Sequence, residues 1–176
     1  WQFEEPKEEI VPTKLGDIIE RKYKTLSEEG KEILEVASVI GGFDIDLIRD
    51  ITNYDEGQVI TNIDSIGRLG LIKERGDRIE FKESISRNAI YNRHVKGVKR
   101  KALHSKVGAI LEDRYKDEKH EVLEGLAYHY YHARDVEKGV KYCMTAGDNA
   151  KKVYSNTSAI EYYTWALTLA KTEKRK

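Results

Sequence analysis

Two histidines and an aspartate at helical spacing come closest to a chemical site. His129-x-x-His132 is followed by Asp135, and imidazole with carboxylate is a donor set that Zn²⁺ accepts when four ligands converge. The histidines lie one helical turn apart, but Asp135 falls in the predicted break after their helix, and no fourth ligand is nearby in the sequence. The tyrosines around them are typical of a packed repeat helix. We therefore expect both histidines to be structural, and we predict no metal site.

Other catalytic arrangements are not apparent in the sequence. No Ser or Cys occurs in a pattern with His and Asp that suggests a nucleophile. The phosphate-binding pattern GxxxxGK[ST] is also missing: its nearest candidate, Gly30-Lys31, has Thr25 in place of the first glycine and Glu32 in place of Ser or Thr. We expect Cys143 to be a small buried hydrophobe. The sequence therefore predicts a non-enzymatic chain with no catalytic or cofactor-binding residue of its own.

Composition limits the setting of the chain. Its 176 residues suffice for one ordinary domain or two small ones, and its 31 basic and 31 acidic residues give zero net charge. One cysteine and no apolar run of about 18 residues predict a reducing, cytoplasmic setting without a membrane span. The chain begins at Trp1, and its only methionine is Met144. We therefore expect a piece of a longer protein.

The first half of the chain has the pattern of short helices followed by a β-hairpin. Thr13, Ser27, Asp44 and Asp55 precede apolar residues spaced three or four apart, as helix caps do. Gly76-Asp77 suits a type II′ hairpin turn. The order of three helices and a hairpin predicts a winged-helix domain. The expected elements are an arm at 1–12, a preceding helix at 14–24, helices from 27 to 41, 45 to 52 and 55 to 69, and strands 71–75 and 78–81.

The second half has the pattern of paired helices. Small residues recur where helices would touch, which allows backbones to approach closely, as in α-solenoid repeats. EKGVKY (137–142) is echoed by TSAIEY (157–162), a shorter period than the tetratricopeptide repeat. We therefore predict a tetratricopeptide-like hairpin array that is not regular. The expected helices are about 83–93, 96–116, 121–133, 136–146, 148–155 and 157–171, with breaks at Arg134-Asp135, Gly147-Asp148 and Asn156-Thr157.

DNA binding is the main alternative that a winged helix raises. The expected groove-reading helix, 55–69, carries one arginine against two acids on its candidate exposed positions, which is poor phosphate chemistry. The wing and the basic cluster of the next long helix suit phosphate better. We therefore keep a nucleic-acid-binding transcriptional regulator as the alternative to a winged helix that contacts protein. Its candidate contacts are Arg68, Lys73, Arg75, Arg78, Lys99 and Lys101.

Three stretches, taken in order, carry a resemblance to a known family. They are LSEEGKEILEVASVIGGFDIDLI, FKESISRNAIY with Arg100 and His104 downstream, and LAYHYYHARDVEKGVKYCMTAGDNAKKVYSNTSAIEYYTWAL, and together they cover roughly residues 13–170. This order resembles the segment after the nucleotide-binding module in STAND-type signal-transduction ATPases. These include regulators of the maltose-activator type and ATPase modules attached to cyclases and kinases. Glu83 departs from the family pattern, which often has His at that position.

The resemblance implies a role in regulation. The winged helix would pack on an upstream nucleotide module, which would bind ATP and Mg²⁺, and the helical arm would sense a protein or small ligand. The long helix 96–116 would couple the two halves, and we expect Arg100 and His104 to share a contact with Glu83 or Asp113. The coupling candidates are Glu83, Arg87, Tyr91, Arg100 and His104.

We place the parts of this regulatory fragment at 1–12 (arm), 13–82 (winged helix with its preceding helix), 83–119 (connecting helices) and 120–176 (start of the repeats). Tyrosine is favoured at recognition surfaces, although packing between helices is its commoner role. The partner-binding candidates are Tyr128, Tyr131, His132 and Tyr162.

Overall fold

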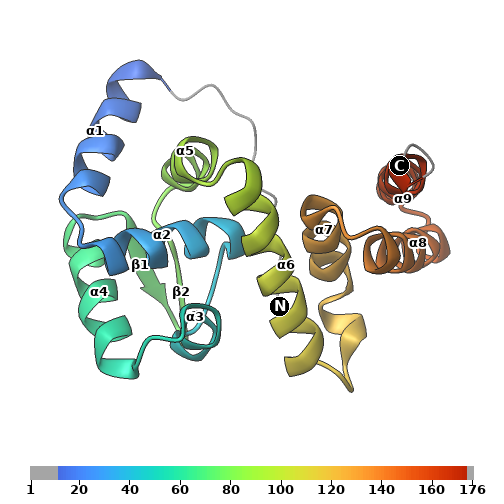
Figure 1. The fold of residues 1–176 in the computed structure, drawn as a ribbon, viewed down its shortest axis with the longest axis horizontal. Helices are drawn as coiled ribbons and strands as arrows, with labels where there is room; N and C mark the ends of the chain where they lie inside the picture. The colour runs from blue at the N-terminus through green and yellow to red at the C-terminus, as the bar shows by residue number, and fades with distance from the viewer. Residues whose placement is uncertain (1–11, 174–176) are drawn as a thin grey trace. The chain divides into compact units, whose positions relative to one another are not determined.

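The computed structural model describes residues 12–173, which form a mainly helical fold with one two-stranded sheet (Figure 1). The chain divides into two compact units between Gly97 and Val98. We call residues 12–97 the first unit and residues 98–173 the second unit. The mainly helical fold class is confirmed, and the predicted arm lies outside the described residues except for Pro12. The helices are α1 (Thr13–Lys24), α2 (Glu28–Ile40), α3 (Ile45–Thr52), α4 (Glu56–Arg68), α5 (Ser84–His94), α6 (Gly97–Arg114), the 3₁₀ turn η1 (Lys119–Glu121), α7 (Leu123–Ala133), α8 (Val136–Lys152) and α9 (Asn156–Glu173).

Helix α2 forms the centre of the first unit. Nine of its thirteen residues are buried, and α3, α4 and α5 pack against it (Figure 1). Such burial on most sides is expected for a helix that neighbours enclose. The apolar stripe predicted for this helix, Ile33, Leu34, Ala37 and Ile40, lies in the core.

Side-chain caps fix most helix starts of the first unit. Ser27, Asp44 and Asp55 each accept a hydrogen bond from a backbone N–H in the first turn of α2, α3 and α4, as predicted. The predicted cap at Thr13 is wrong. The carbonyl of Pro12 accepts the first helical hydrogen bond, from Gly16 N at 2.9 Å, so Thr13 is already the first helical residue. Proline suits this place because its φ is fixed and it has no N–H to satisfy.

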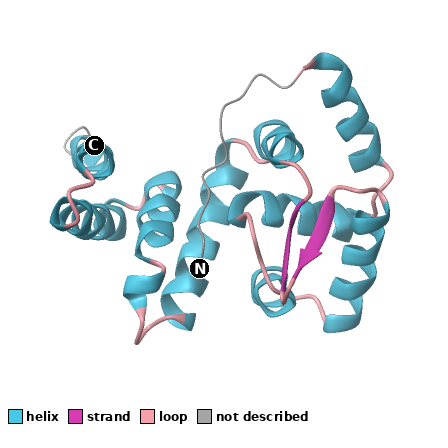
Figure 2. Ribbon diagram, turned by 180° about the vertical axis from the view of Figure 1, so that it is seen from behind, coloured by secondary structure: helices cyan, strands magenta, loops and turns pink. Residues whose placement is uncertain are grey.

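The β-hairpin follows α4, as predicted. Strands β1 (Ile72–Arg75) and β2 (Arg78–Phe81) form the antiparallel pair drawn in magenta in Figure 2. Ile72 lies opposite Phe81. Gly76 has φ of 61°, and Asp77 is not among the residues with positive φ, as a type II′ turn requires. Phe43 extends this small sheet through a bridge to Ile79, which ties the loop after α2 to β2.

The second unit is a series of helices joined by short turns. Helix α7 packs against α8, and α8 packs against α9, so consecutive helices reverse direction as in αα-hairpins. Two glycines of α8 allow the closest approaches. A Cβ on Gly139 would lie 2.4 Å from Leu169 Cδ1, and one on Gly147 would lie 2.6 Å from Tyr163 Cε1.

The predicted break at Gly147-Asp148 is wrong, because α8 runs without interruption from Val136 to Lys152. Glycine inside a helix costs about 1 kcal/mol relative to alanine, and this cost suggested a helix end. Here the glycine has a packing role instead, since the ring of Tyr163 occupies the space that a side chain would need. The Tyr163 hydroxyl donates a hydrogen bond to Asp148 Oδ1 at 2.7 Å.

Candidate functional site

The second unit contains a cluster of imidazoles and aromatic rings, which we call the histidine cluster. His104 comes from α6, Tyr128, His129 and His132 come from α7, and Trp165 comes from α9. Tyr128 and His132, four apart on α7, share one face of that helix, whereas His129, next to Tyr128, lies on a different side. The cluster therefore joins three helices, and its imidazoles can take up and release protons.

A hydrogen bond between two imidazoles is the core of the cluster. His104 Nδ1 lies 3.0 Å from His129 Nδ1, and both side chains are 0% exposed. One Nδ1 must donate the proton and the other must accept it through its lone pair. At least one of the two rings is therefore neutral.

His132 is the third imidazole, and its ring centroid lies 4.9 Å from that of His104 and 4.3 Å from that of Tyr128. Burial, together with the positive charges of Arg100 and Arg134, lowers the pKa of His132 to about 4. Both effects disfavour the charged form. His132 is therefore neutral at neutral pH.

An aromatic edge borders the histidine cluster. Tyr131 stacks on Trp165 with centroids 4.8 Å apart and planes 9° apart, and Tyr162 meets Trp165 edge-on at 5.5 Å. The Arg134 guanidinium lies over the Tyr131 ring at 5.5 Å. Tyr131, His132 and Tyr162 are half-buried, so three of the four predicted partner-binding residues present part of their surface. Tyr128 is only 1% exposed, and its ring packs inside the unit.

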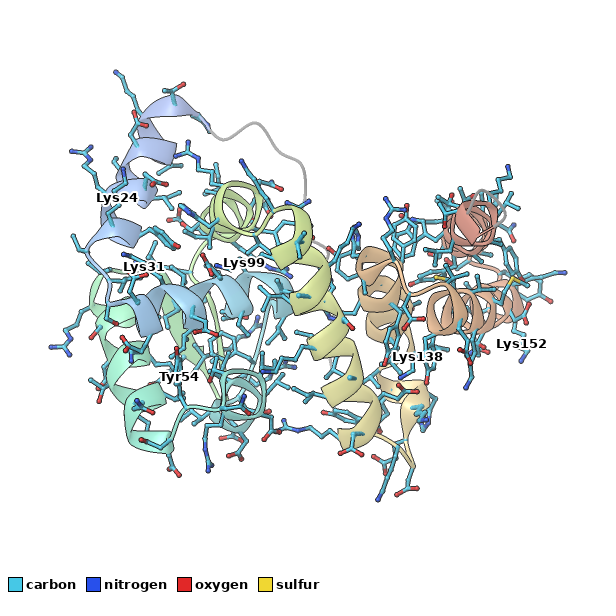
Figure 3. The ribbon with its side chains drawn as sticks, viewed as in Figure 1. Lys24, Lys31, Tyr54, Lys99, Lys138 and Lys152 are labelled. Carbon is cyan, nitrogen blue, oxygen red and sulfur yellow. The ribbon has the colours of Figure 1, made fainter. Side chains whose placement is uncertain are left out.

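A second polar cluster is centred on Glu112 of α6, and we call it the Glu112 cluster. Tyr130 Oη donates to Glu112 Oε2 at 2.6 Å, and Lys138 Nζ donates to the same oxygen at 2.7 Å. Tyr142 Oη donates to Glu112 Oε1. Lys138, labelled in Figure 3, also lies over the Tyr130 ring at 5.0 Å. One carboxylate thus ties α6 to both α7 and α8.

The proton affinities of the Glu112 cluster follow from these contacts. Burial alone would raise the pKa of Glu112, but hydrogen bonds from Lys138, Tyr130 and Tyr142 outweigh it and lower this pKa to about 2. Burial and the bond to Glu112 raise the pKa of Tyr130 to about 12. The hydrogen bond to Glu112 raises the pKa of Lys138. The cluster is therefore an ion pair with neutral phenols, and it holds no group ready to transfer a proton near pH 7.

The coupling candidates are divided between the units. Arg87 is buried in the first unit, where its Nε donates to the Ser38 carbonyl at 2.9 Å and its Nη2 donates to the Val39 carbonyl at 3.4 Å. Gly41 makes room for it, since a Cβ there would lie 3.1 Å from the guanidinium. Tyr91 is buried, and Glu83 is the exposed residue before α5, with no side-chain cap bond. Arg100 and His104 lie on α6 in the second unit, where His104 bonds His129.

Four of the six basic residues predicted to contact DNA, those of α4 and the hairpin, have partners in the first unit. Lys73 and Arg75 both approach Glu80, at 3.2 Å and 3.7 Å, and Arg78 donates to the Gly42 carbonyl. Arg68 Nε reaches the backbone of Asp64 at 3.4 Å. Lys99, labelled in Figure 3, and Lys101 lie on α6 in the second unit. Lys73 and Arg75 of β1 are thus partly neutralised by Glu80 of the paired strand β2.

Sequence reasoning missed Glu112, Lys138, Trp165 and the His104–His129 bond. One signal was available: Lys138 and Tyr142 are four apart on one helix face, and buried phenols require an acceptor. Cys143 is buried, as predicted, and burial raises the pKa of its thiol to about 12. Within residues 12–173, no group of three His, Cys, Asp or Glu side chains is arranged to hold a metal ion.

Comparison with known proteins found no match: no family model, no curated protein and no solved structure resembles this chain closely enough to count. None of the helices among the described residues combines the length and the apolar character that crossing a membrane requires.

Proposed function

We propose that this chain is a non-catalytic regulatory segment of a larger STAND-type signal-transduction ATPase. In this proposal residues 13–82 are a winged-helix domain, residues 83–119 connect, and residues 120–176 begin a tetratricopeptide-like array. ATP and Mg²⁺ would bind an upstream nucleotide module that contacts the winged helix, in the cytoplasm. The order of α2, α3, α4 and the hairpin, together with the Phe43–Ile79 bridge, supports the winged helix.

The observation that carries this proposal is the contact of Arg87 with the end of α2. The helix that ends in glycine before Phe43 and the run FKESISRNAIY carry the resemblance separately. The structure joins them, since Arg87 of that run bonds the carbonyls of Ser38 and Val39 beside Gly41. A buried guanidinium must be fully hydrogen-bonded to be tolerated. The two motifs therefore depend on each other, which supports a shared architecture.

The aromatic edge of the second unit supports a binding role for the arm. Trp, Tyr and Arg are the residues that most often dominate binding energy at protein interfaces. Here Tyr131, Tyr162 and Trp165 are half-buried, and Arg134 is exposed beside them. We propose that this edge contacts a protein or a small ligand.

The test of the coupling uses the protein encoded by the whole reading frame. We expect Tyr91→Ala and Arg100→Glu to change its rate of ATP hydrolysis, because each removes a side chain proposed to transmit contact between modules. Lys106→Glu, at an exposed position of the same helix, is the matched control. Unchanged rates in folded variants, checked by circular dichroism, would contradict the proposal.

Measuring DNA binding as the salt concentration is raised distinguishes this proposal from the alternative, a winged helix that binds DNA. Phosphate binding by several cations weakens steeply as salt rises. Because Glu80 already pairs with Lys73 and Arg75, we expect no binding to a labelled duplex at low ionic strength, measured by fluorescence anisotropy. Salt-dependent binding that Arg75→Glu abolishes would favour the alternative.

A further inference from the structure

The bond between His104 and His129 joins α6 to α7 at a place that the solvent does not reach. We propose that this contact is an acid-operated latch: when the histidine cluster takes up protons, the seam between α6 and α7 opens. The latch would make the helical array respond to pH. It does not depend on the regulatory function proposed above, because it concerns only contacts inside the second unit.

The geometry of the pair limits how many protons it holds. Two Nδ1 atoms 3.0 Å apart share one proton in a hydrogen bond, so the accepting ring carries its own proton on Nε2. A cationic imidazole is a donor at both nitrogens. If the accepting ring is protonated, two N–H groups face each other and the bond is lost. Double protonation and the closed seam are therefore incompatible.

The surroundings also oppose positive charge. The two charged groups that act on His132 are Arg100 of α6 and Arg134 after α7, and both are cationic. Aromatic rings also pack on these imidazoles: Tyr128 of α7 packs on His104 and His132, and Trp165 of α9 lies edge-on to His132 at 6.4 Å. Rings of this kind do not replace the hydration that a buried cation loses. Each added proton is therefore easier to accept when the seam is open.

Close packing prevents a small adjustment from relieving the added charge. Gly108 of α6 lies against α7, where a Cβ would be 3.2 Å from the Tyr130 ring and 3.5 Å from His129 Cβ. Packed side chains in protein interiors yield in discrete steps and do not deform smoothly. We expect α7 to separate from α6 as a unit.

The size of the response follows from the groups involved. The pKa of His132 is about 4 in the closed seam and 6.5 in its ordinary state. Between pH 7.5 and 5, this residue alone raises the opening equilibrium about 30-fold. The imidazole pair adds to this factor.

The test measures amide hydrogen exchange of α7 in the whole chain at pH 7.5 and pH 5, corrected for the intrinsic effect of pH. We expect the opening equilibrium of α7 to rise at least about 30-fold. Replacement of His104 and His129 by Asn and of His132 by Gln keeps polar groups that cannot be protonated, and we expect the rise to disappear. His120→Gln, at an exposed position, is the matched control and should keep it.

A second measurement on the unaltered protein keeps the proposal testable if the triple variant does not fold. Nitrogen chemical shifts of the imidazoles at pH 7.5 should show the proton on Nδ1 in one ring of the pair and on Nε2 in the other. Two rings with the proton on Nε2 would overturn the latch. Unchanged exchange at pH 5 would overturn it as well, as would slower exchange on adding Zn²⁺, because a metal rather than a proton would then bridge the nitrogens.

Discussion

The two units differ in the residue types that occupy left-handed backbone positions. In the first unit, the residues with positive φ are Asn53 and the glycines at 41, 70, 76 and 97, whereas in the second unit they are Arg134 and Tyr154, both at 60°. Glycine and asparagine adopt this region readily, and larger side chains pay an energetic penalty there. The first unit therefore follows local rules, and the second unit departs from them.

Buried polar groups show a partial contrast. In the first unit, the permanently charged Arg87 bonds backbone carbonyls that do not titrate, although the buried carboxylate of Glu35 also accepts a hydrogen bond from Tyr23 Oη at 2.7 Å. In the second unit, Glu112 bonds phenols and an amine, and the imidazoles of His104 and His129 share a proton. Departures from local consistency gather at functional or strained places in proteins. The comparison thus directs attention to the second unit as the part that responds to its surroundings.

The largest effect tests the first unit. We expect Arg87→Met to lower the free energy of unfolding by about 4 kcal/mol, because two hydrogen bonds from a charged donor are lost and buried carbonyls stay unsatisfied. Hydrogen exchange of α2 measures it separately from the second unit. Arg49→Met is the control: Arg49 makes only ion pairs with exposed partners, so its loss should cost less than about 1 kcal/mol. Equal losses in the two variants would show that the buried hydrogen bonds of Arg87 stabilise the first unit no more than the exposed ion pairs of Arg49 do.

The next effect tests the Glu112 cluster. We expect Glu112→Gln to lower the stability of the second unit by about 3 kcal/mol, the free energy that corresponds to the lowered pKa of Glu112. An amide cannot pair with Lys138 as a carboxylate does. Urea unfolding followed by hydrogen exchange of α8 measures the loss, with Glu121→Gln at an exposed position as the control. A loss below about 1 kcal/mol would show that the ion pair only offsets its own desolvation.

The pH dependence of stability should separate the two clusters. Both folded pKa values are depressed, so each group stabilises the fold above its unfolded pKa, and this stability is lost as pH falls through the folded value. The window for His132 runs from 6.5 to about 4, and that for Glu112 runs from 4.5 to about 2. We expect the second unit to lose about 2 kcal/mol between pH 7.5 and 5 through His132. Glu112→Gln should remove only the lower window in an acid titration followed by circular dichroism.

The smallest effect tests backbone strain. Tyr154 is 88% exposed and has a left-handed backbone, so Tyr154→Gly should raise the stability of the second unit by about 1 kcal/mol. Tyr154→Ala is the control, because it removes the same ring but keeps the Cβ that causes the strain. Thermal unfolding of the three proteins measures the difference. A gain in the alanine variant equal to that in the glycine variant would show that the ring, not the backbone, is responsible.

The sequence predicted well those features of the fold that depend on interactions between residues close together in the chain. The caps Ser27, Asp44 and Asp55 and the turn at Gly76 were predicted because each acts on residues within one helical or β-turn. The break at Gly147 was wrong because the packing of Tyr163, which comes sixteen residues later, overrides the low helix propensity of glycine. Propensity is a weak guide where tertiary contacts decide.

The sites were harder to predict than the elements. Periodicity indicated that His104 and His129 lie on packed helices, but it does not say which residue of another helix faces them. Their bond joins residues 25 apart in sequence, and Glu112 reaches Lys138 across 26. Contacts of this range follow from the register between helices, which side-chain volumes set together.

The glycines at 139 and 147 fix the position of α9 on α8 at two separate points. One receives Leu169 and the other receives Tyr163, so α9 is held at two points along α8, and both its rotation and its lengthwise shift are fixed. A methyl group added at either glycine would need the space that a side chain of α9 now occupies, so that side chain or α9 itself would have to move. The absence of a Cβ at these two glycines therefore sets how closely, and at what angle, α9 packs on α8.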